Sequence, residues 1–235
     1  KRIQDPNDKR SLLVYPTEKM LEAFPKIQYH MDEPQSNPSS VPLYFLAQLA
    51  SEHVTVVLSG EGADEIYAGY EEYDVRGLSA KYRKIPGFLR RGAAGIAKKL
   101  PYFKGHDFII KGSGVPEDYF IGQALVFPED EALDILNEKY RNGPFVKDIT
   151  KPVYDRAKNL SEVEKKQYLD MNLWLPGDIL LKADKMSMAH SLELRVPYLD
   201  RFVMEEAEEP VGVGADVQAK GPNAATGFYA FRITN

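Results

Sequence analysis

The residues with the clearest potential for chemistry lie in a short turn, residues 59–65, with the sequence SGEGADE. Its two glycines carry no side chains, so the backbone N–H groups of the turn can approach an anion closely. Asp64 and Glu65 add hard oxygen ligands of the kind that Mg²⁺ prefers. The turn therefore predicts a site for an anion and a metal ion. An ordinary strand-to-helix turn with solvated acids is the alternative interpretation.

A short apolar run, residues 54–58 with the sequence VTVVL, leads directly into this turn. A run without polar alternation is typical of a strand buried on both faces in a parallel sheet. Ligands of such sheets bind beyond the carboxyl ends of the strands, which is where the turn lies. The proline-rich stretch 32–42 predicts a loop and the apolar stretch 43–50 a helix, so the order is loop, helix and strand, as in α/β proteins.

A second group of charged residues lies in an otherwise apolar stretch nearer the other end of the chain. Asp178 and Lys182 are four residues apart, which predicts that they share one face of a helix. A cation and a carboxylate on one face suit pyrophosphate with its Mg²⁺, so we predict that Lys182 binds pyrophosphate and that Asp178 binds the metal. For Glu193, Arg195 and Asp200 the favoured interpretation is a salt-bridge network that fixes the local turn.

Helix signals dominate the remaining chain. Thr17 fits the N-cap of a short helix over residues 17–24. Residues 77–112 are basic and interrupted by Gly and Pro, which favours short solvated helices, and no nucleic-acid-binding motif accompanies the basic residues. The sequence SEVE at 161–164 fits a capping box. We expect the chain after residue 75 to be mostly helical, with few or no added strands.

The composition limits the class of protein. The 235 residues are 43% hydrophobic and 28% charged, which is ordinary for a soluble globular chain. The net charge of −5 argues against nucleic-acid and anionic-membrane partners, and no apolar stretch is long enough to span a membrane. The chain has no cysteine and only four scattered histidines, so we expect neither a thiolate nucleophile nor a histidine metal cluster.

Three stretches of the sequence together resemble the synthetase domain of the asparagine synthase family. They are residues 59–70 (SGEGADEIYAGY), residues 182–200 (KADKMSMAHSLELRVPYLD) and the acidic, proline-rich loop at 32–42. The resemblance covers roughly residues 10–207. It implies an α/β fold with an ATP-pyrophosphatase (adenine nucleotide alpha hydrolase-like) parallel sheet, here incomplete, followed by a mostly helical region.

By this resemblance the parent enzyme is an ATP-dependent amide ligase that uses ATP and Mg²⁺. ATP activates the side-chain carboxylate of aspartate as an acyl-adenylate and releases pyrophosphate. Ammonia from a separate glutaminase domain then attacks to give asparagine and AMP. The resemblance implies that Ser59 and Gly60 contact the nucleotide or adenylate. It also implies that Glu61 binds the adenylate and faces the amine as the catalytic residue, and that Asp64 supports Mg²⁺ and pyrophosphate.

The sequence also departs from the family pattern. The family's phosphate-binding loop, Ser-Gly-Gly-x-Asp-Ser, and its glutaminase domain with a catalytic cysteine have no counterpart in these residues, and residues 210–235 are atypical. We predict that residues 1–72 are the distal part of the nucleotide-binding synthetase domain and that 73–235 are its helical remainder. We expect an interior piece of a larger cytoplasmic enzyme, compatible with a homodimer, that does not make asparagine by itself.

Two other interpretations stay open. A paralogue would use the same adenylation to make another amide or a lactam, as β-lactam-forming synthetases do. Those relatives carry Tyr where this chain has Glu61, which argues against that interpretation. A non-catalytic fragment would act as a binding module, and this interpretation is supported only by the missing phosphate-binding loop and the atypical tail.

Overall fold

A computed structural model of the protein describes residues 2–4, 12–14, 16–33, 37–73, 78–97, 99–101, 103–123 and 129–208. These residues pack as two compact units. Unit 1 contains the described residues up to Glu61 together with Ile179–Asp200, and unit 2 contains Gly62–Asp178 and the residues from Arg201 onward. The units follow the packing of the chain, and the domain boundary after residue 72 stays a prediction.

Unit 1 combines short strands with longer helices. Its described elements are β1 (Arg2–Gln4), β2 (Leu12–Val14), α1 (Glu18–Met31), α2 (Ser40–Ser51), β3 (Val56–Leu58), α11 (Leu181–Met188), β4 (Glu193–Arg195) and the 3-10 turn η4 (Pro197–Leu199). β1 and β2 form an antiparallel pair, and β3 and β4 form a parallel pair. The small parallel sheet agrees with the predicted α/β character of this part of the chain.

The strand predicted ahead of the glycine turn is confirmed as β3. Val57, at its centre, is only 1% exposed and packs with Ala47 and Leu192. Val56 and Leu58 point away from Val57 and are half-buried. The prediction of a strand buried on both faces is therefore wrong, because α2 and the start of the 192–195 segment cover one face more fully than the other.

The first helix is longer than predicted. Thr17 caps it as expected, since its Oγ1 accepts a hydrogen bond from the backbone N–H of the third residue on, at 3.2 Å. The helix then continues through Pro25 instead of ending before it. Ala23, Ile27 and Met31 are spaced by four and are all buried, so packing of this face compensates for the hydrogen bond that Pro25 cannot donate.

The second helix starts earlier than predicted. α2 begins at Ser40, so the expected loop over 32–42 is wrong for its last three residues. Pro42 is the third residue of α2 and lies in the first turn, where a backbone N–H has no acceptor within the helix. A proline is therefore tolerated at this position.

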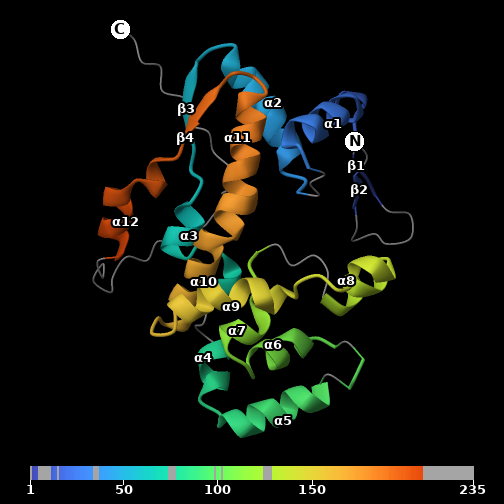
Figure 1. Ribbon diagram of the computed structural model, residues 1–235, viewed down its shortest axis with the longest axis vertical. Helices are drawn as coiled ribbons and strands as arrows, with labels where there is room; N and C mark the ends of the chain where they lie inside the picture. Colours follow the sequence, from blue (N-terminus) through green and yellow to red (C-terminus); the bar gives the residue numbers. More distant parts are fainter. Residues whose placement is uncertain are drawn as a thin grey trace. The chain divides into compact units, whose positions relative to one another are not determined.

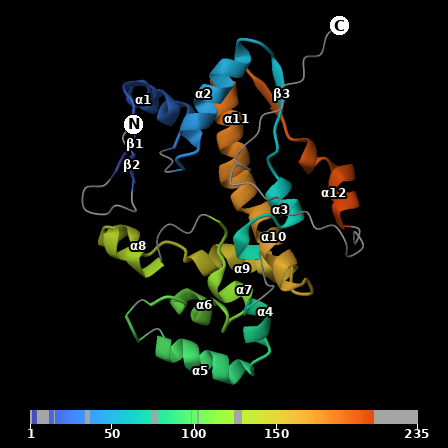
Figure 2. The same ribbon diagram turned by 180° about the vertical axis from the view of Figure 1, so that it is seen from behind.

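Three helices make the main core of unit 1. Figures 1 and 2 show α2 and α11 lying side by side, and α1 contacts both. The buried residues of this core are Ala23, Ile27, Met31, Val41, Leu43, Tyr44, Ala183 and Met186. This packing joins the proline-rich stretch near residue 40 to the segment after residue 181, although about 140 residues separate them in the chain.

Unit 2 is helical in all its described elements. They are α3 (Ala63–Tyr67), η1 (Glu71–Tyr73), α4 (Leu78–Arg83), α5 (Gly87–Ala97), α6 (His106–Lys111), α7 (Pro116–Tyr119), α8 (Glu129–Ile135), η2 (Glu138–Tyr140), α9 (Val146–Arg156), α10 (Glu162–Asn172), the first residues of the π-helical turn η3 (Leu175–Leu180) and α12 (Arg201–Glu208). The helical character expected after residue 75 is confirmed, with β4 of unit 1 as the one later strand among the described residues. No helix of the described residues has both the length and the apolar character needed to cross a membrane.

The predicted capping box is present at the start of α10. The N–H of Ser161 donates to Oε2 of Glu164 at 2.7 Å, and the N–H of Glu164 donates to Oγ of Ser161 at 3.4 Å. These bonds help to fix where α10 begins. α10 in turn packs against α9 and α3, so it supports the short helix that follows the glycine turn.

Candidate functional site

The glycine turn begins where β3 leaves the parallel sheet. The N–H of Ser59 donates to the carbonyl of Arg195 at 2.8 Å, which extends the pairing of β3 with β4 by one bond. Ser59 is 8% exposed. A Cβ placed on Gly60 would have no heavy atom within 4 Å, and Gly62 has φ of 90°, a conformation that L side chains rarely adopt. Open space at Gly60 therefore lets a ligand approach the backbone.

Two contacts tie α11 to the acidic, proline-rich stretch. Lys182 is only 4% exposed, and its Nζ donates to Oγ of Ser39 at 2.7 Å. One turn further along α11, Lys185 forms an ion pair with Asp32. Within unit 1, these contacts and the Ser59–Arg195 bond join the 182–200 stretch to the 32–42 stretch and to the first residues of the 59–70 stretch. Ser39 was not predicted as a site residue, although it lies in one of those stretches.

Asp64 lies in α3 and is solvent-exposed. A Cβ on Gly69 would come within 2.1 Å of Oδ1 of Asp64, so the carboxyl group lies directly against the glycine backbone. Partial desolvation of this carboxyl group raises the pKa of Asp64. Among the described residues, no group of three or more His, Cys, Asp or Glu side chains could hold a metal ion. One exposed carboxylate nevertheless suits Mg²⁺ that is also bound by phosphate oxygens.

The other predicted site residues have distinct surroundings. Glu61, the last residue of the first segment of unit 1, is half-buried. Asp178 is also half-buried and lies in the π-helical turn η3 (Leu175–Leu180), whereas Lys182 lies in α11. A π-turn contains more residues than an α-turn, so a spacing of four does not by itself place Asp178 and Lys182 on one face. Their common face stays a prediction.

The charged group before η4 is partly explained by an ion pair. Nε of Arg195 lies 2.8 Å from Oε1 of Glu193, and both side chains are more than half exposed. This pair agrees with the favoured structural interpretation of these charges. Because both ions are solvated, the pair itself contributes little to stability.

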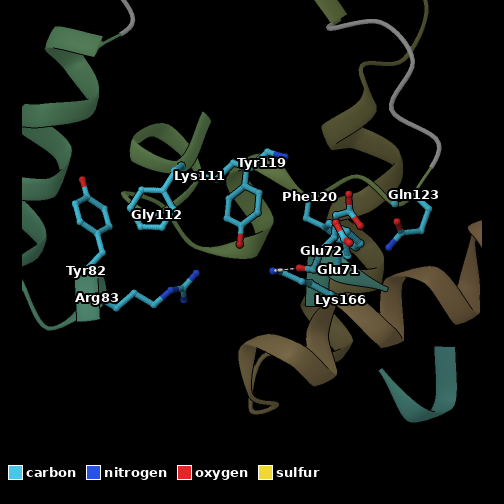
Figure 3. A pocket seen from close by; sticks show the side chains of 12 residues that line it. Glu71, Glu72, Tyr82, Arg83, Lys111, Gly112, Tyr119, Phe120, Gln123 and Lys166 are labelled. Carbon is cyan, nitrogen blue, oxygen red and sulfur yellow. Dashed lines mark hydrogen bonds between the residues drawn. The ribbon is translucent and has the colours of Figure 1, made fainter. Parts of the chain in front are cut away.

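A cavity of about 410 Å³ in unit 2 is lined by α4, α6, α7 and α10. Figure 3 shows the side chains of Arg83, Tyr119 and Lys166 pointing toward one another. Glu162 explains this arrangement, because it forms an ion pair with Arg83, accepts a hydrogen bond from the hydroxyl of Tyr119 at 2.8 Å and lies 3.5 Å from Nζ of Lys166. Nζ of Lys166 also donates to the carbonyl of Glu72 at 2.7 Å. A single carboxylate of the protein thus pairs with both cations, and we interpret the cluster as structural.

A carboxyl group is fully buried on the inner face of α10. Asp170 has no exposed surface, and its Oδ2 accepts hydrogen bonds from the hydroxyl of Tyr73 at 2.5 Å and from Nε2 of Gln123 at 3.3 Å. Its Oδ1 has no hydrogen-bond partner. Burial raises the pKa of Asp170 to about 6, and the bonds from Tyr73 and Gln123 oppose that rise. No feature of the sequence indicated this group.

We expect Asp170 to make the stability of the chain depend on pH. Because the pKa of Asp170 is raised on folding, the proton stabilises the folded state, and this contribution is complete below the unfolded pKa and lost as the pH rises through about 6. A shift of this size corresponds to at most about 3 kcal/mol. Urea unfolding of the wild type and Asp170→Asn between about pH 4 and pH 7 should show a flatter profile for the variant. Parallel profiles would contradict the assignment, and Asp134→Asn, an exposed acid of α8, is the control.

Comparisons with known proteins agree with the resemblance seen in the sequence. The model of the asparagine synthase family matches residues 8–209 of the chain. The glutamine-hydrolyzing asparagine synthetase 1 of Bacillus subtilis is 41% identical over 201 residues, which are 85% of this chain and 31% of that protein. A protein of Mycobacterium tuberculosis, named "Putative asparagine synthetase [glutamine-hydrolyzing]", is 39% identical over 201 residues. The matched residues are again 85% of this chain and 31% of that protein.

A more distant relative is a protein of Methanocaldococcus jannaschii named "Putative asparagine synthetase [glutamine-hydrolyzing] 2". It is 32% identical over 122 residues, which are 50% of this chain and 22% of that protein. The chain thus spans less than a third of the length of these curated relatives. No solved structure matches the chain.

Proposed function

The chain belongs to the asparagine synthase family, and we propose that the full-length protein is an ATP-dependent amide ligase that makes asparagine. In the first step, the side-chain carboxylate of aspartate attacks the α-phosphate of ATP and pyrophosphate leaves. In the second step, ammonia attacks the acyl carbon and loses a proton. The bond between this carbon and the phosphate oxygen then breaks, and AMP leaves with the oxygen and the bonding electrons. The structural observation that supports this proposal most directly is in unit 1, where the 182–200 stretch contacts both the 32–42 stretch and Ser59, the first residue of the 59–70 stretch.

The glycine turn would bind the nucleotide and the adenylate. Ser59 is fixed by its bond to Arg195, and the space at Gly60 would admit a phosphate or acyl group close to the backbone. Glu61 projects from a turn whose backbone position is set by β3 on one side and Gly62 on the other. Its carboxylate would hold the amino group of the substrate and accept a proton from the attacking ammonia.

Asp64 and Asp178 would hold Mg²⁺, which when bound neutralises charge on the departing pyrophosphate. Asp64 is suited to this by its exposure and by the close support of Gly69. Lys182 would contribute positive charge to the pyrophosphate site. Because its Nζ is buried and bonded to Ser39, it would also keep the acidic, proline-rich stretch in place.

The proposal is tested with the full-length protein purified with all its domains. We expect pyrophosphate to exchange into ATP only when aspartate is present, and asparagine and AMP to form in equal amounts when ammonia or glutamine is added. Exchange that requires another carboxylate would identify a paralogue with a different acceptor. Absence of any carboxylate-dependent exchange from a folded protein would contradict the ligase assignment.

A further inference from the structure

The short helix that carries Asp64 is held at its C-terminal end by a side chain from another helix. α3 has only five residues, and the last carbonyls of a helix have no partner within it. Gln167, in the middle of α10, donates from Nε2 to the carbonyls of Glu65 at 2.7 Å and Ile66 at 2.9 Å. These two carbonyls follow Asp64 directly in the chain. Both helices belong to unit 2.

Further contacts fix α3 on the side away from solvent. Glu65 is only 1% exposed, and its carboxylate accepts a hydrogen bond from the hydroxyl of Tyr70 at 2.9 Å. The N–H of Gly69 donates to the carbonyl of Asp64 at 2.8 Å. Asp64 itself remains exposed. The backbone around Asp64 is therefore constrained on its inner side, while the residue itself stays accessible to a ligand.

A helix of this length is not stable without tertiary contacts, so its orientation depends on the groups that bind it. Gln167 satisfies two of its terminal carbonyls with a single amide. Gln167 is only half-buried and lines a cavity of about 460 Å³ with Glu164, Met171 and Met204. Its replacement therefore does not empty a densely packed core, and we expect the variant to fold.

We propose that Gln167 is a positioning residue that holds α3 so that the carboxylate of Asp64 is aimed at its ligand. This role rests on the proposed function, because Asp64 acts on Mg²⁺ and pyrophosphate there. Gln167 touches neither the substrate nor the metal. Its effect passes through the backbone of Glu65 and Ile66, in the way that outer hydrogen bonds orient the direct ligands of a metal.

The test uses Gln167→Met in the full-length protein, since Met has a similar volume but no N–H groups. We expect aspartate-dependent pyrophosphate exchange to fall by about 10- to 100-fold, and the affinity for Mg²⁺ in the presence of ATP, measured by calorimetric titration without aspartate, to fall by a similar factor. In an Asp64→Asn background, Gln167→Met should cause little further loss, because both changes act on one carboxylate. If Gln167→Met lowers the melting temperature strongly, Gln167→Asn is used instead. Asn keeps the amide but is one methylene shorter, so its amide is moved away from the carbonyls of α3.

The matched control is Asn172→Ala on the same helix. The Nδ2 of Asn172 also donates to a carbonyl, but this is the carbonyl of Tyr168 within α10 itself, at 2.8 Å, and Asn172 is exposed. We expect its exchange rate and Mg²⁺ affinity to equal those of the wild type. Wild-type exchange in Gln167→Met, or losses that add fully to those of Asp64→Asn, would overturn the positioning role alone. A wild type without aspartate-dependent exchange would overturn the proposed function and this role with it.

Discussion

Replacing Glu61 with Gln is expected to reduce asparagine formation by the full-length protein by about 100- to 10,000-fold, the range typical of losing a positioned general base. The variant keeps the size of the side chain and removes its charge. Glutamine at this position can no longer accept a proton from the attacking ammonia or pair with a cationic amino group. Asparagine formation should be measured with ammonia supplied directly, because ammonia would bypass the glutaminase site of the proposed enzyme.

The design separates a defect in synthesis from one in ammonia supply or folding. A defect that persists with ammonia lies in the synthetase part, and unchanged glutamine hydrolysis would show that the other domain is intact. Glu52→Gln is the control, since Glu52 is an exposed acid between α2 and β3 in the same unit. A solvated turn acid at position 61 would change the stability by no more than about 0.5 kcal/mol on replacement. Wild-type synthesis by Glu61→Gln would show that the catalytic assignment is wrong.

The sequence predicts best those features that local physics decides. The strand before the glycine turn, the cap at Thr17 and the capping box at Ser161 are all present because each depends on residues that are neighbours in the chain. Prolines were less informative. Pro25 lies within α1 and Pro42 within the first turn of α2, where packing and the lack of an acceptor make a proline acceptable.

The contacts that organise the candidate site connect distant parts of the chain, and the sequence pattern did not indicate them. Lys182 was predicted for its charge, and its bond to Ser39 depends on how α11 packs against α2. Gln167 gave no signal at all, because a glutamine on a polar helix is ordinary until the helix it faces is known. The family resemblance drew attention to three segments but did not specify which side chains pair between them.

The burial of Asp170 is another feature that depends on contacts between distant parts of the chain. Its neighbours in sequence, within the EVEKKQYLDMN segment of α10, suggest a solvent-facing acid. The structure instead places it against Tyr73 and Gln123, which come from elements far away in the chain. Burying a charged carboxyl group costs free energy. Hydrogen-bond partners or a bound proton must therefore offset this cost at Asp170.

Replacing Asp64 with Asn is expected to lower aspartate-dependent exchange of pyrophosphate into ATP by about 100- to 1,000-fold, as when one preorganised electrostatic contact is lost. Asn preserves the shape of the side chain against Gly69 but removes the charge that Mg²⁺ requires. Because Asp64 is exposed, the fold should be little affected. The exchange assay reports the adenylation step alone, so the loss should appear without ammonia or glutamine.

The dependence on Mg²⁺ distinguishes a ligand from a structural acid. If Asp64 binds the metal, raising the Mg²⁺ concentration should recover part of the exchange in Asp64→Asn, and the metal requirement should shift upward. Asp134→Asn changes the net charge equally at an exposed site on α8 and should leave both quantities unchanged. Unchanged exchange in a folded Asp64→Asn protein would give Asp64 a structural role in the turn, where its carboxyl group lies against the backbone of Gly69. The proposed magnesium site would then lose the ligand for which the structure gives the strongest support.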